Sequence, residues 1–330
     1  MRALAKAKKT DLSPLSGLSS LEELDLRDND AADLAPLAGL KKLSYLNLHS
    51  NTRVRSLRPL ADLPGLQTLI MRNVPVGKEI GALKNLSRLE RLNLRNCGVE
   101  SAGPLRALAR LRSLDLRGNP LTDLSPLKGL GSLEVLDLRE NDVADLAALA
   151  GRKKLSYLNL HSNRRIGSLE PLKDLTGLKT LIMRNVPAGG SISALRKLKS
   201  LRRLNVRNCG IADTAVLGEL MAAGALRDDP GRGEEAEVNL LDNPLPAAGS
   251  DPYRPIRPYW GSISRREPFA LPYAPSAVSP PVFSREGGFY GEPFDLELAA
   301  SAPGAAIHYT LGGSEPTERS AQYAGPLRIE

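Results

Sequence analysis

Leucine spacing organises the first two thirds of the chain, where the pattern L-x-x-L-x-L recurs every 22 or 23 residues. In each recurrence the third to seventh residues alternate polar and apolar, as in the run from Glu23 to Arg27. Alternation with a period of two indicates a strand with one buried face. No single unit could bury its leucines alone, so the pattern predicts a stack of units that share one leucine core. Nine units are expected, beginning at Leu21, Leu43, Leu66, Leu89, Leu111, Leu133, Leu155, Leu178 and Leu201.

A second, longer repeat of 112 residues contains the shorter one. LEVLDLREND, which begins at Leu133, reappears as LEELDLRDND at Leu21. A recent duplication that has not diverged would explain this near-identity without any function. After the strands, the pattern D-L-x-P-L-x-x-L spaces its leucines at three residues, as from Asp33 to Leu40. This spacing predicts a 3₁₀ or short α-helical turn on the outer side of the stack.

One position after each predicted strand is usually Asn or Cys. Here the sequence resembles the leucine-rich repeat family, whose pattern is L-x-x-L-x-L-x-x-(N/C)-x-L, over residues 11–224. The 22-residue period with D-L-x-P-L resembles the bacterial internalin-type subclass. The resemblance implies an α/β solenoid, a parallel-sheet horseshoe with a helical or 3₁₀ outer side, in which these residues form a ladder that bonds backbone groups of neighbouring turns. The ladder residues are Asn29, Asn51, Cys97, Asn119, Asn141, Asn163 and Cys209.

Two units depart from that pattern. Val74 and Val186 occupy the ladder position, and Asn73 and Asn185 come one residue early, so locally irregular turns are expected there. The two cysteines are expected to lie several strands apart, too far for a disulfide, whose Cα atoms must lie within ~7 Å. A ladder role for them is favoured over a reactive thiol.

The two ends of the repeat region are predicted differently. Residues 1–20 are expected to be a partial repeat, because DLSPLSGLSS at Asp11 matches the outer side of a unit, while MRALAKAKKT replaces the strand. That decapeptide is expected to be poorly ordered or a short helix, and the chain to begin within a longer parent. No signal peptide is visible, because the decapeptide lacks an apolar core of ~7–15 residues. The nine repeats themselves are assigned to residues 21–224.

Residues 225–279 are predicted to be a proline-rich cap and connector. Eleven prolines lie between Pro230 and Pro281, a density that excludes regular helix over most of the segment. EVNLLDNPL at Glu237 resembles a last strand and turn, with Asn243 near the ladder position. Apolar runs such as YRPIRPYW suit a cap over the exposed end of the leucine core. The expected buried contacts are Tyr253, Ile256, Tyr259, Trp260 and Phe269.

Residues 280–330 form a further predicted domain. Alternation in FDLELAA and AIHYTL indicates strands separated by glycine-rich turns. Segments 288–296 and 307–317 resemble the chitobiase/β-hexosaminidase C-terminal-type domain, an immunoglobulin-like β-sandwich, although Gly312 replaces the usual Asp. The resemblance implies a partial sandwich, one or two strands short. Repeats, connector and sandwich in this order resemble the N-terminal part of bacterial spore-coat CotH-type kinase proteins, and this implies an extracellular, spore or cell-surface setting; no kinase domain is present in these residues.

The outward positions of the predicted strands line up in columns, because parallel strands ~4.8 Å apart place equivalent residues side by side. The inner column contains Asp25, Asp115 and Asp137 among Asn and Ile residues. Tyr45 and Tyr157 precede it on their strands. The outer column, called the arginine column below, consists of Arg27, His49, Arg72, Arg95, Arg117, Arg139, His161, Arg184 and Arg207.

Two interpretations of these columns remain open. The aspartates could neutralise the arginines and give a soluble face in which each pair contributes little. Alternatively, seven stacked guanidiniums could bind carboxylates or phosphates, which Arg grips with two parallel hydrogen bonds. Nucleic acid is a less attractive partner, because only Tyr45 and Tyr157 could stack on bases there.

The net charge of +8 permits an anionic partner. No Ser-His-Asp arrangement, metal-ligand spacing, phosphate-binding loop or dinucleotide fingerprint accompanies the three histidines, so neither an enzyme nor a cofactor is predicted. No run approaches the ~18 apolar residues of a membrane span. We expect a monomeric scaffold that binds a protein partner, for which the basic face favours an acidic surface. The alternative is attachment to a wall polymer or glycan through the basic face and the sandwich.

Overall fold

The computed structural model describes residues 2–4, 11–245, 252–266, 282–284, 293–299, 306–309 and 320–329. The chain divides into two compact units, residues 1–267 and 268–330. Each unit is described by itself below. No helix among the described residues is long and apolar enough to cross a membrane.

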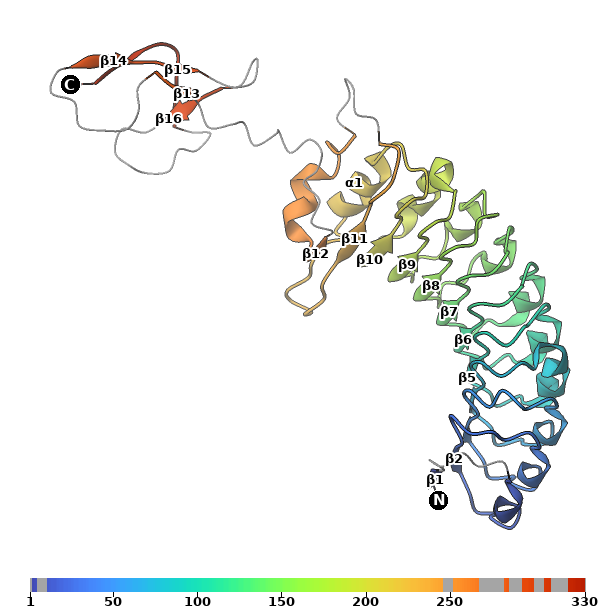
Figure 1. Ribbon diagram of the computed structural model, residues 1–330. Helices are drawn as coiled ribbons and strands as arrows, with labels where there is room; N and C mark the ends of the chain where they lie inside the picture. Colours follow the sequence, from blue (N-terminus) through green and yellow to red (C-terminus); the bar gives the residue numbers. More distant parts are fainter. Residues whose placement is uncertain are drawn as a thin grey trace. The chain divides into compact units, whose positions relative to one another are not determined.

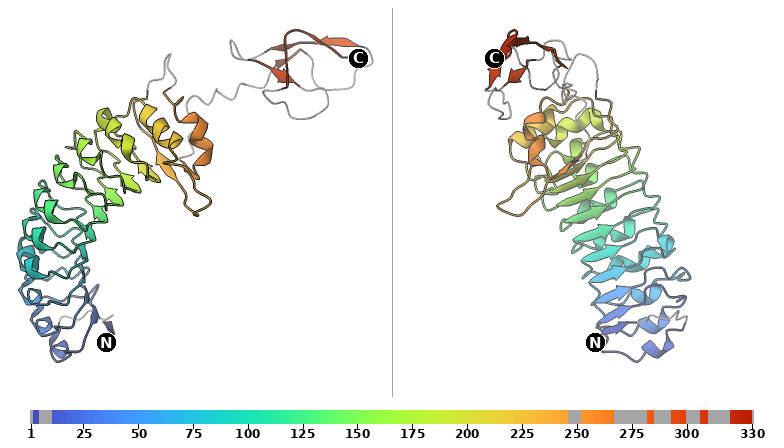
Figure 2. Two further views of the ribbon diagram at one scale, coloured as in Figure 1. Left: turned by 180° about the vertical axis from the view of Figure 1, so that it is seen from behind. Right: turned by 60° about the vertical axis from the view of Figure 1, so that its left-hand side comes forward.

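The first unit contains an all-parallel sheet in which twelve strands follow one another in chain order. The strands lie along the inner side of a curved stack, and short helices lie along its outer side (Figures 1 and 2). Each strand is short because only the part of a repeat in which polar and apolar residues alternate is extended. The strands are β1 (Arg2–Leu4), β2 (Glu23–Asp25), β3 (Tyr45–Asn47), β4 (Thr68–Ile70), β5 (Arg91–Asn93), β6 (Ser113–Asp115), β7 (Val135–Asp137), β8 (Tyr157–Asn159), β9 (Thr180–Ile182), β10 (Arg203–Asn205), β11 (Glu237–Asn239) and β12 (Arg265–Arg266).

The outer side consists of 3₁₀ helices and one α-helix. The leucines within and directly after each strand, such as Leu24 and Leu26, are buried together with the helical leucines, such as Leu37. The stack is therefore one continuous leucine core, as the spacing predicts. The helices are η1 (Ser13–Leu15), η2 (Ala35–Leu37), η3 (Arg58–Leu60), η4 (Gly77–Asn85), η5 (Gly103–Ala107), η6 (Ser125–Gly129), η7 (Ala147–Leu149), η8 (Glu170–Leu172), η9 (Gly189–Lys197), α1 (Ala215–Ala222) and η10 (Arg257–Ser262).

The start of the chain differs from the expectation. Arg2–Leu4 form strand β1, which pairs in parallel with β2, so the segment MRALAKAKKT does contain a strand of the sheet. The expected helix or unstructured start is wrong for these three residues. The edge of β2 offers unpaired backbone groups, and even a poorly matching sequence can satisfy them by adding one more strand.

Asparagine side chains connect successive turns of the stack. The Asn119 amide nitrogen donates to the backbone oxygens of Leu94 and Leu116 at 2.9 and 2.7 Å, and its oxygen accepts from the N–H groups of Cys97 and Val99 at 3.1 and 2.9 Å. Each Asn therefore satisfies groups on its own turn and on the preceding one. Equivalent bonds come from Asn51, Asn141, Asn163 and Asn243.

In the repeat that follows each of the two valine turns, a cysteine occupies the ladder position. The Cys97 thiol donates to the Met71 oxygen at 2.9 Å, and the N–H groups of Val74 and Val76 already bond to backbone oxygens within their own turn. No side-chain acceptor is required there, so a thiol that only donates is sufficient. Burial raises the pKa of Cys97 to about 12 and that of Cys209 to about 11, which keeps both protonated as hydrogen-bond donors.

The two valine turns are irregular in their backbone hydrogen bonds, because the N–H groups of Val76 and Ala188 bond to the oxygens of Val74 and Val186, but the left-handed residue is unchanged. Asn73 and Asn185 have φ angles of 60°, close to the 61° of Ser50 and Ser162 in ordinary turns. A second difference lies on the outer side, where η4 and η9 each span nine residues. A residue with a positive φ angle precedes the ladder position in every repeat from β2 to β11.

The end of the leucine core is covered by the proline-rich segment. Ile256, Tyr253 and Trp260 are buried, Tyr259 is half-buried, and Ile263 is fully buried as well. Phe269 lies outside the described residues. The backbone of Pro255 approaches Gly218 of α1 so closely that a Cβ there would lie 2.5 Å from the Pro255 oxygen. This close approach shows that the segment packs directly on the last helix.

The second unit contains three antiparallel strand pairs. β13 (Val282–Phe283) pairs with β15 (Leu298–Ala299), β14 (Phe294–Leu296) with β18 (Leu327–Ile329), and β16 (His308–Tyr309) with β17 (Ala321–Gln322). The alternating sequences FDLELAA and AIHYTL therefore supply strands, and the antiparallel pairing fits the predicted β-sandwich class. Part of the glycine-rich motif, Gly312 included, lies outside the described residues.

Candidate binding surface on the inner face of the sheet

Three columns of side chains face outward from the sheet on its inner side. They come from the first and third strand residues and from the residue two positions further on. Besides the arginine column, these are the strand-start column (Glu23, Tyr45, Thr68, Arg91, Ser113, Val135, Tyr157, Thr180, Arg203 and Glu237) and the amide column (Asp25, Asn47, Ile70, Asn93, Asp115, Asp137, Asn159, Ile182, Asn205 and Asn239).

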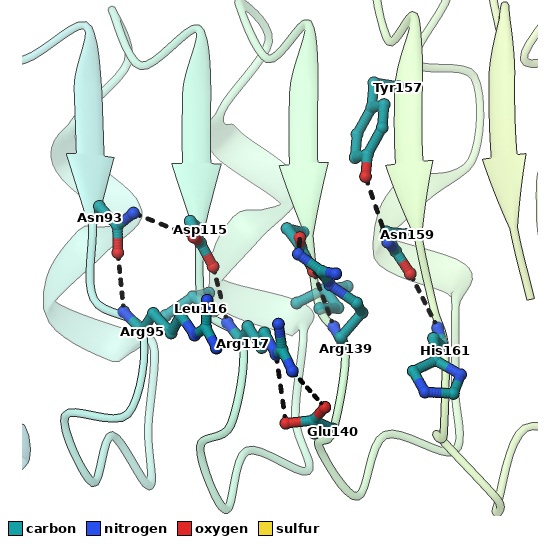
Figure 3. A network of polar contacts seen from close by, with 12 residues as sticks. Asn93, Arg95, Asp115, Leu116, Arg117, Arg139, Glu140, Tyr157, Asn159 and His161 are labelled. Carbon is teal, nitrogen blue, oxygen red and sulfur yellow. Dashed lines mark hydrogen bonds and ion pairs between the residues drawn. The ribbon is translucent and has the colours of Figure 1, made fainter. Parts of the chain in front are cut away.

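The amide column has a local structural function. In most repeats its side-chain oxygen accepts the N–H of the residue two positions on, as between Asn93 and Arg95 at 3.0 Å and between Asp115 and Arg117 at 3.0 Å (Figure 3). This bond ends the strand by occupying a backbone donor that would otherwise be unpaired. Asp25 and Asp137 are 2% and 7% exposed, so their carboxylates offer little surface to a ligand; a binding role for them remains a prediction.

The aspartates of this column differ in their electrostatics. The guanidinium of Arg27 bonds to Asp25 and lowers the pKa of that carboxyl. Burial, followed by repulsion from Asp137, raises the pKa of Asp115, although Asp115 accepts a hydrogen bond from Asn93 at 3.0 Å. The central carboxylate is therefore less stable in its charged form than the one at the end of the sheet.

Many members of the arginine column are paired with acids or backbone. Arg27 and Arg139 bond to the aspartates of their own strands, and Arg117 bonds to Glu140 at 2.7 Å (Figure 3). Arg207 lies 2.7 Å from Asp242. His49 and His161 contact the backbone oxygens of Arg72 and Arg184 at 3.0 and 2.9 Å. Acids thus neutralise four arginines of the column, whereas Arg72, Arg95 and Arg184 have no acid partner in the described part of the chain.

A groove of about 410 Å³ lies over strands β3 to β8. Tyr45 and Tyr157 line it at the first and last of these strands, and Ile70 and Val135 give it apolar side chains. Val135 is 36% exposed, one of two large hydrophobic side chains exposed to that degree in the described residues. Polar walls come from Thr68, Arg91, Asn93, Ser113, Asp115 and Asp137.

Sequence interpretation had singled out Tyr45 and Tyr157 but not the apolar side chains between them. The signal was present in the alternation, because Val135 and Ile70 occupy positions that are polar in most repeats. The described residues contain no group of three or more His, Cys, Asp or Glu side chains that could hold a metal ion.

The parallel sheet, the outer 3₁₀ helices and the asparagine ladder together define a leucine-rich repeat solenoid. The leucine-rich repeat family models match residues 87–129, 109–151 and 197–217. The chitobiase/beta-hexosaminidase C-terminal domain family matches residues 285–330. No curated protein matches the sequence.

Solved structures are similar to the repeat region. An internalin, InlF, from Listeria monocytogenes has 28% identity and a TM-score of 0.71 over 82% of this chain and 73% of its own. A leucine-rich repeat protein from Leptospira interrogans has 22% identity and a TM-score of 0.56, over 76% of this chain and 73% of its own. The plant peptide hormone receptor RGFR1, solved in complex with RGF2, has 17% identity and a TM-score of 0.52, over 71% of this chain and 42% of its own. The last two share the fold alone. Proteins of this fold commonly bind other proteins, and this supports a binding scaffold.

Proposed function

We propose that the chain is a non-catalytic scaffold that binds an extended segment of a protein partner in the groove over β3 to β8. The observation that carries this proposal is the apolar floor of Ile70 and Val135 between two tyrosines, in a groove whose remaining walls are largely polar. Half-exposed apolar side chains in a groove lower the free energy of a complex when a partner removes them from water.

The dimensions of the groove suit a short peptide. Five strand spacings of about 4.8 Å separate β3 from β8, so the groove is about 24 Å long. An extended chain rises about 3.4 Å per residue, so about seven residues span it. Tyrosines at both ends supply rigid, amphipathic contact area at a low cost in conformational entropy.

The duplicated blocks provide a matched pair of variants that tests the groove. Ile70→Asn removes an apolar side chain from the groove, whereas Ile182→Asn makes the same change on the equivalent strand β9, outside it. Asn is the natural residue of this column on β3, β5, β8 and β10, so both variants should fold. Peptides selected on the wild-type protein from a random displayed library should bind Ile70→Asn at least about tenfold more weakly, because one large apolar contact is worth about 1.5–3 kcal/mol. Equal losses in the two variants would contradict the groove.

A finer proposal concerns the whole protein. The order of repeats, connector and C-terminal unit supports the chain being the N-terminal part of a CotH-type bacterial protein. Sequencing the genomic region around the coding sequence tests this, and a downstream domain of another class would refute it. Attachment to a wall polymer or glycan is the alternative function, supported by the net charge of +8. Co-sedimentation with purified wall polymer at low and high salt separates it from protein binding.

A further inference from the structure

The arginine column is neutralised by acids at two kinds of position. One is the amide column of the same strand, where Asp25 and Asp137 bond to Arg27 and Arg139. The other is the left-handed turn residue of the next repeat, where Glu140 bonds to Arg117. An arginine with an uncharged residue at both positions therefore has no acid within reach.

Arg72 and Arg95, which follow the adjacent strands β4 and β5, are in this situation. Their amide-column residues are Ile70 and Asn93, and the next turn residues are Asn96 and Gly118. The Nε atoms of both arginines are buried, and they are the buried side-chain nitrogen and oxygen atoms that lack a hydrogen-bond partner in the described part of the chain. Two neighbouring guanidiniums thus hold desolvated donors that nothing in the described residues satisfies, a costly arrangement.

The charges around this pair leave a positive excess. The groups facing it are Arg117, which Glu140 neutralises, Arg139, which Asp137 neutralises, and Asp115. Burial, then repulsion from Arg117 and Arg72, lowers the pKa of Arg95. Asp115 attracts Arg95, so one carboxylate stands against two arginines, Arg72 and Arg95, that have no acid partner of their own among the described residues. One further negative charge would complete the balance.

We propose that Arg72 and Arg95 form a carboxylate-binding site at the edge of the groove, which takes an Asp or Glu side chain of the bound partner segment. Equivalent residues on neighbouring strands lie about 4.8 Å apart, so one carboxylate can accept a hydrogen bond from each guanidinium. Ile70 lines the groove and ends strand β4, two residues before Arg72. The partner segment that fits both features carries an acidic residue next to an apolar one.

This inference rests on the proposed groove but adds a separate requirement for the bound segment. The groove alone requires apolar contacts, whereas the site requires a negative charge at one place. The second block supplies the control, because Arg184 and Arg207 are the equivalents of Arg72 and Arg95 after 112 residues. Arg207 is neutralised by Asp242 at 2.7 Å, so among the described residues only Arg184 lacks an acid partner there, and the second block has no pair of adjacent unneutralised arginines.

The site can be tested without a known partner. In ¹⁵N spectra of the full chain, each arginine Nε–H gives a signal. The signals of Arg72 and Arg95 are identified because they disappear in Arg72→Gln and Arg95→Gln, respectively. N-acetylglutamate amide should shift these two signals more than those of Arg184 and Arg207, and N-acetylglutamine amide should not. Equal shifts along the whole column, or shifts by both probes, would overturn the site. A response to inorganic phosphate with none to the glutamate probe would also overturn it.

Peptide selection separates the two proposals. Peptides selected on the wild-type protein should be rich in Asp or Glu beside an apolar residue. The double variant Arg72→Gln/Arg95→Gln should bind them about ten- to a hundredfold more weakly, because hydrogen bonds to charged groups contribute about 1.5–3 kcal/mol. Arg184→Gln/Arg207→Gln, which changes the net charge equally, should bind as the wild type does. Peptides that depend on Ile70 but bind both double variants alike would refute the carboxylate site and leave the groove standing. Selection of no peptide at all would count against both.

Discussion

Replacement of Asn119 by Ala is the sharpest test of how the stack is held together. Three backbone groups lose their side-chain partner, namely the N–H groups of Cys97 and Val99 and the oxygen of Leu94. The Leu116 oxygen keeps a bond from Asn141 at 3.0 Å. Each buried group left without a partner costs about 1–3 kcal/mol. Since water can enter a turn near the surface, we expect a total loss of about 3–5 kcal/mol, below the simple sum.

Cys97→Ala is the matched comparison at the same position of the neighbouring turn. The thiol donates to Met71, whose oxygen also accepts from Val74 at 3.0 Å. No backbone group is therefore left without a partner, and we expect a loss of about 1 kcal/mol from the deleted contact. The asparagine variant should be destabilised several times more than the cysteine variant.

Guanidinium denaturation followed by circular dichroism measures both variants against the wild type. Changes in the transition midpoint at a constant slope report stability. Broadening of the transition in Asn119→Ala would indicate that the two halves of the stack unfold separately, which a weakened turn permits in a repeat protein. If the two variants differ from each other by less than about 1 kcal/mol, then the count of orphaned backbone groups does not control ladder stability and the reasoning is refuted.

Two further predictions concern electrostatics and backbone contact. Arg27 lowers the pKa of Asp25 from 3.8, so the ion pair stabilises the fold above that pH, and this stabilisation is lost as the pH falls through the folded-state pKa. Asp25→Asn should therefore flatten the acid side of a stability profile measured between pH 2 and 7. Burial raises the pKa of Asp115, so the wild type loses stability as the pH rises from 3.8 through the folded-state pKa of this carboxyl, and Asp115→Asn should remove the loss. The two variants should therefore change the stability profile in opposite directions, and parallel profiles would contradict this prediction. Gly77→Ala should lower the unfolding midpoint, because its Cβ would lie 1.8 Å from a backbone oxygen of the next turn, with a cost of about 1–3 kcal/mol or more. Gly81→Ala, in the same helix with open space around it, should be neutral or stabilising, and equal effects of the two alanines in thermal melts would argue against a close approach.

Much of the solenoid could be predicted from local pattern. The alternation from Glu23 to Arg27, repeated at a constant period, determines which residues form strands and which leucines enter the core. Stacking is the remaining step, and it is required because no unit buries its leucines alone. The arrangement of Tyr45 and Tyr157 on one face follows equally from the period. Strand β1 could not be predicted, because its pairing depends on the open edge of β2 and not on its own residues.

The candidate site required the tertiary structure. The sequence alone determined that arginines and aspartates form neighbouring columns, since parallel register turns a repeated position into a row. It could not decide which arginines are neutralised, because the acid that matters is 23 residues away for Arg117 and 35 residues away for Arg207. Only the folded structure decided that Asp25 is buried as a partner of Arg27 while Arg72 and Arg95 keep desolvated, unpaired nitrogens. The physical reason is that charge pairing and desolvation depend on side chains from adjacent turns, whereas the repeat pattern depends on spacing within each one.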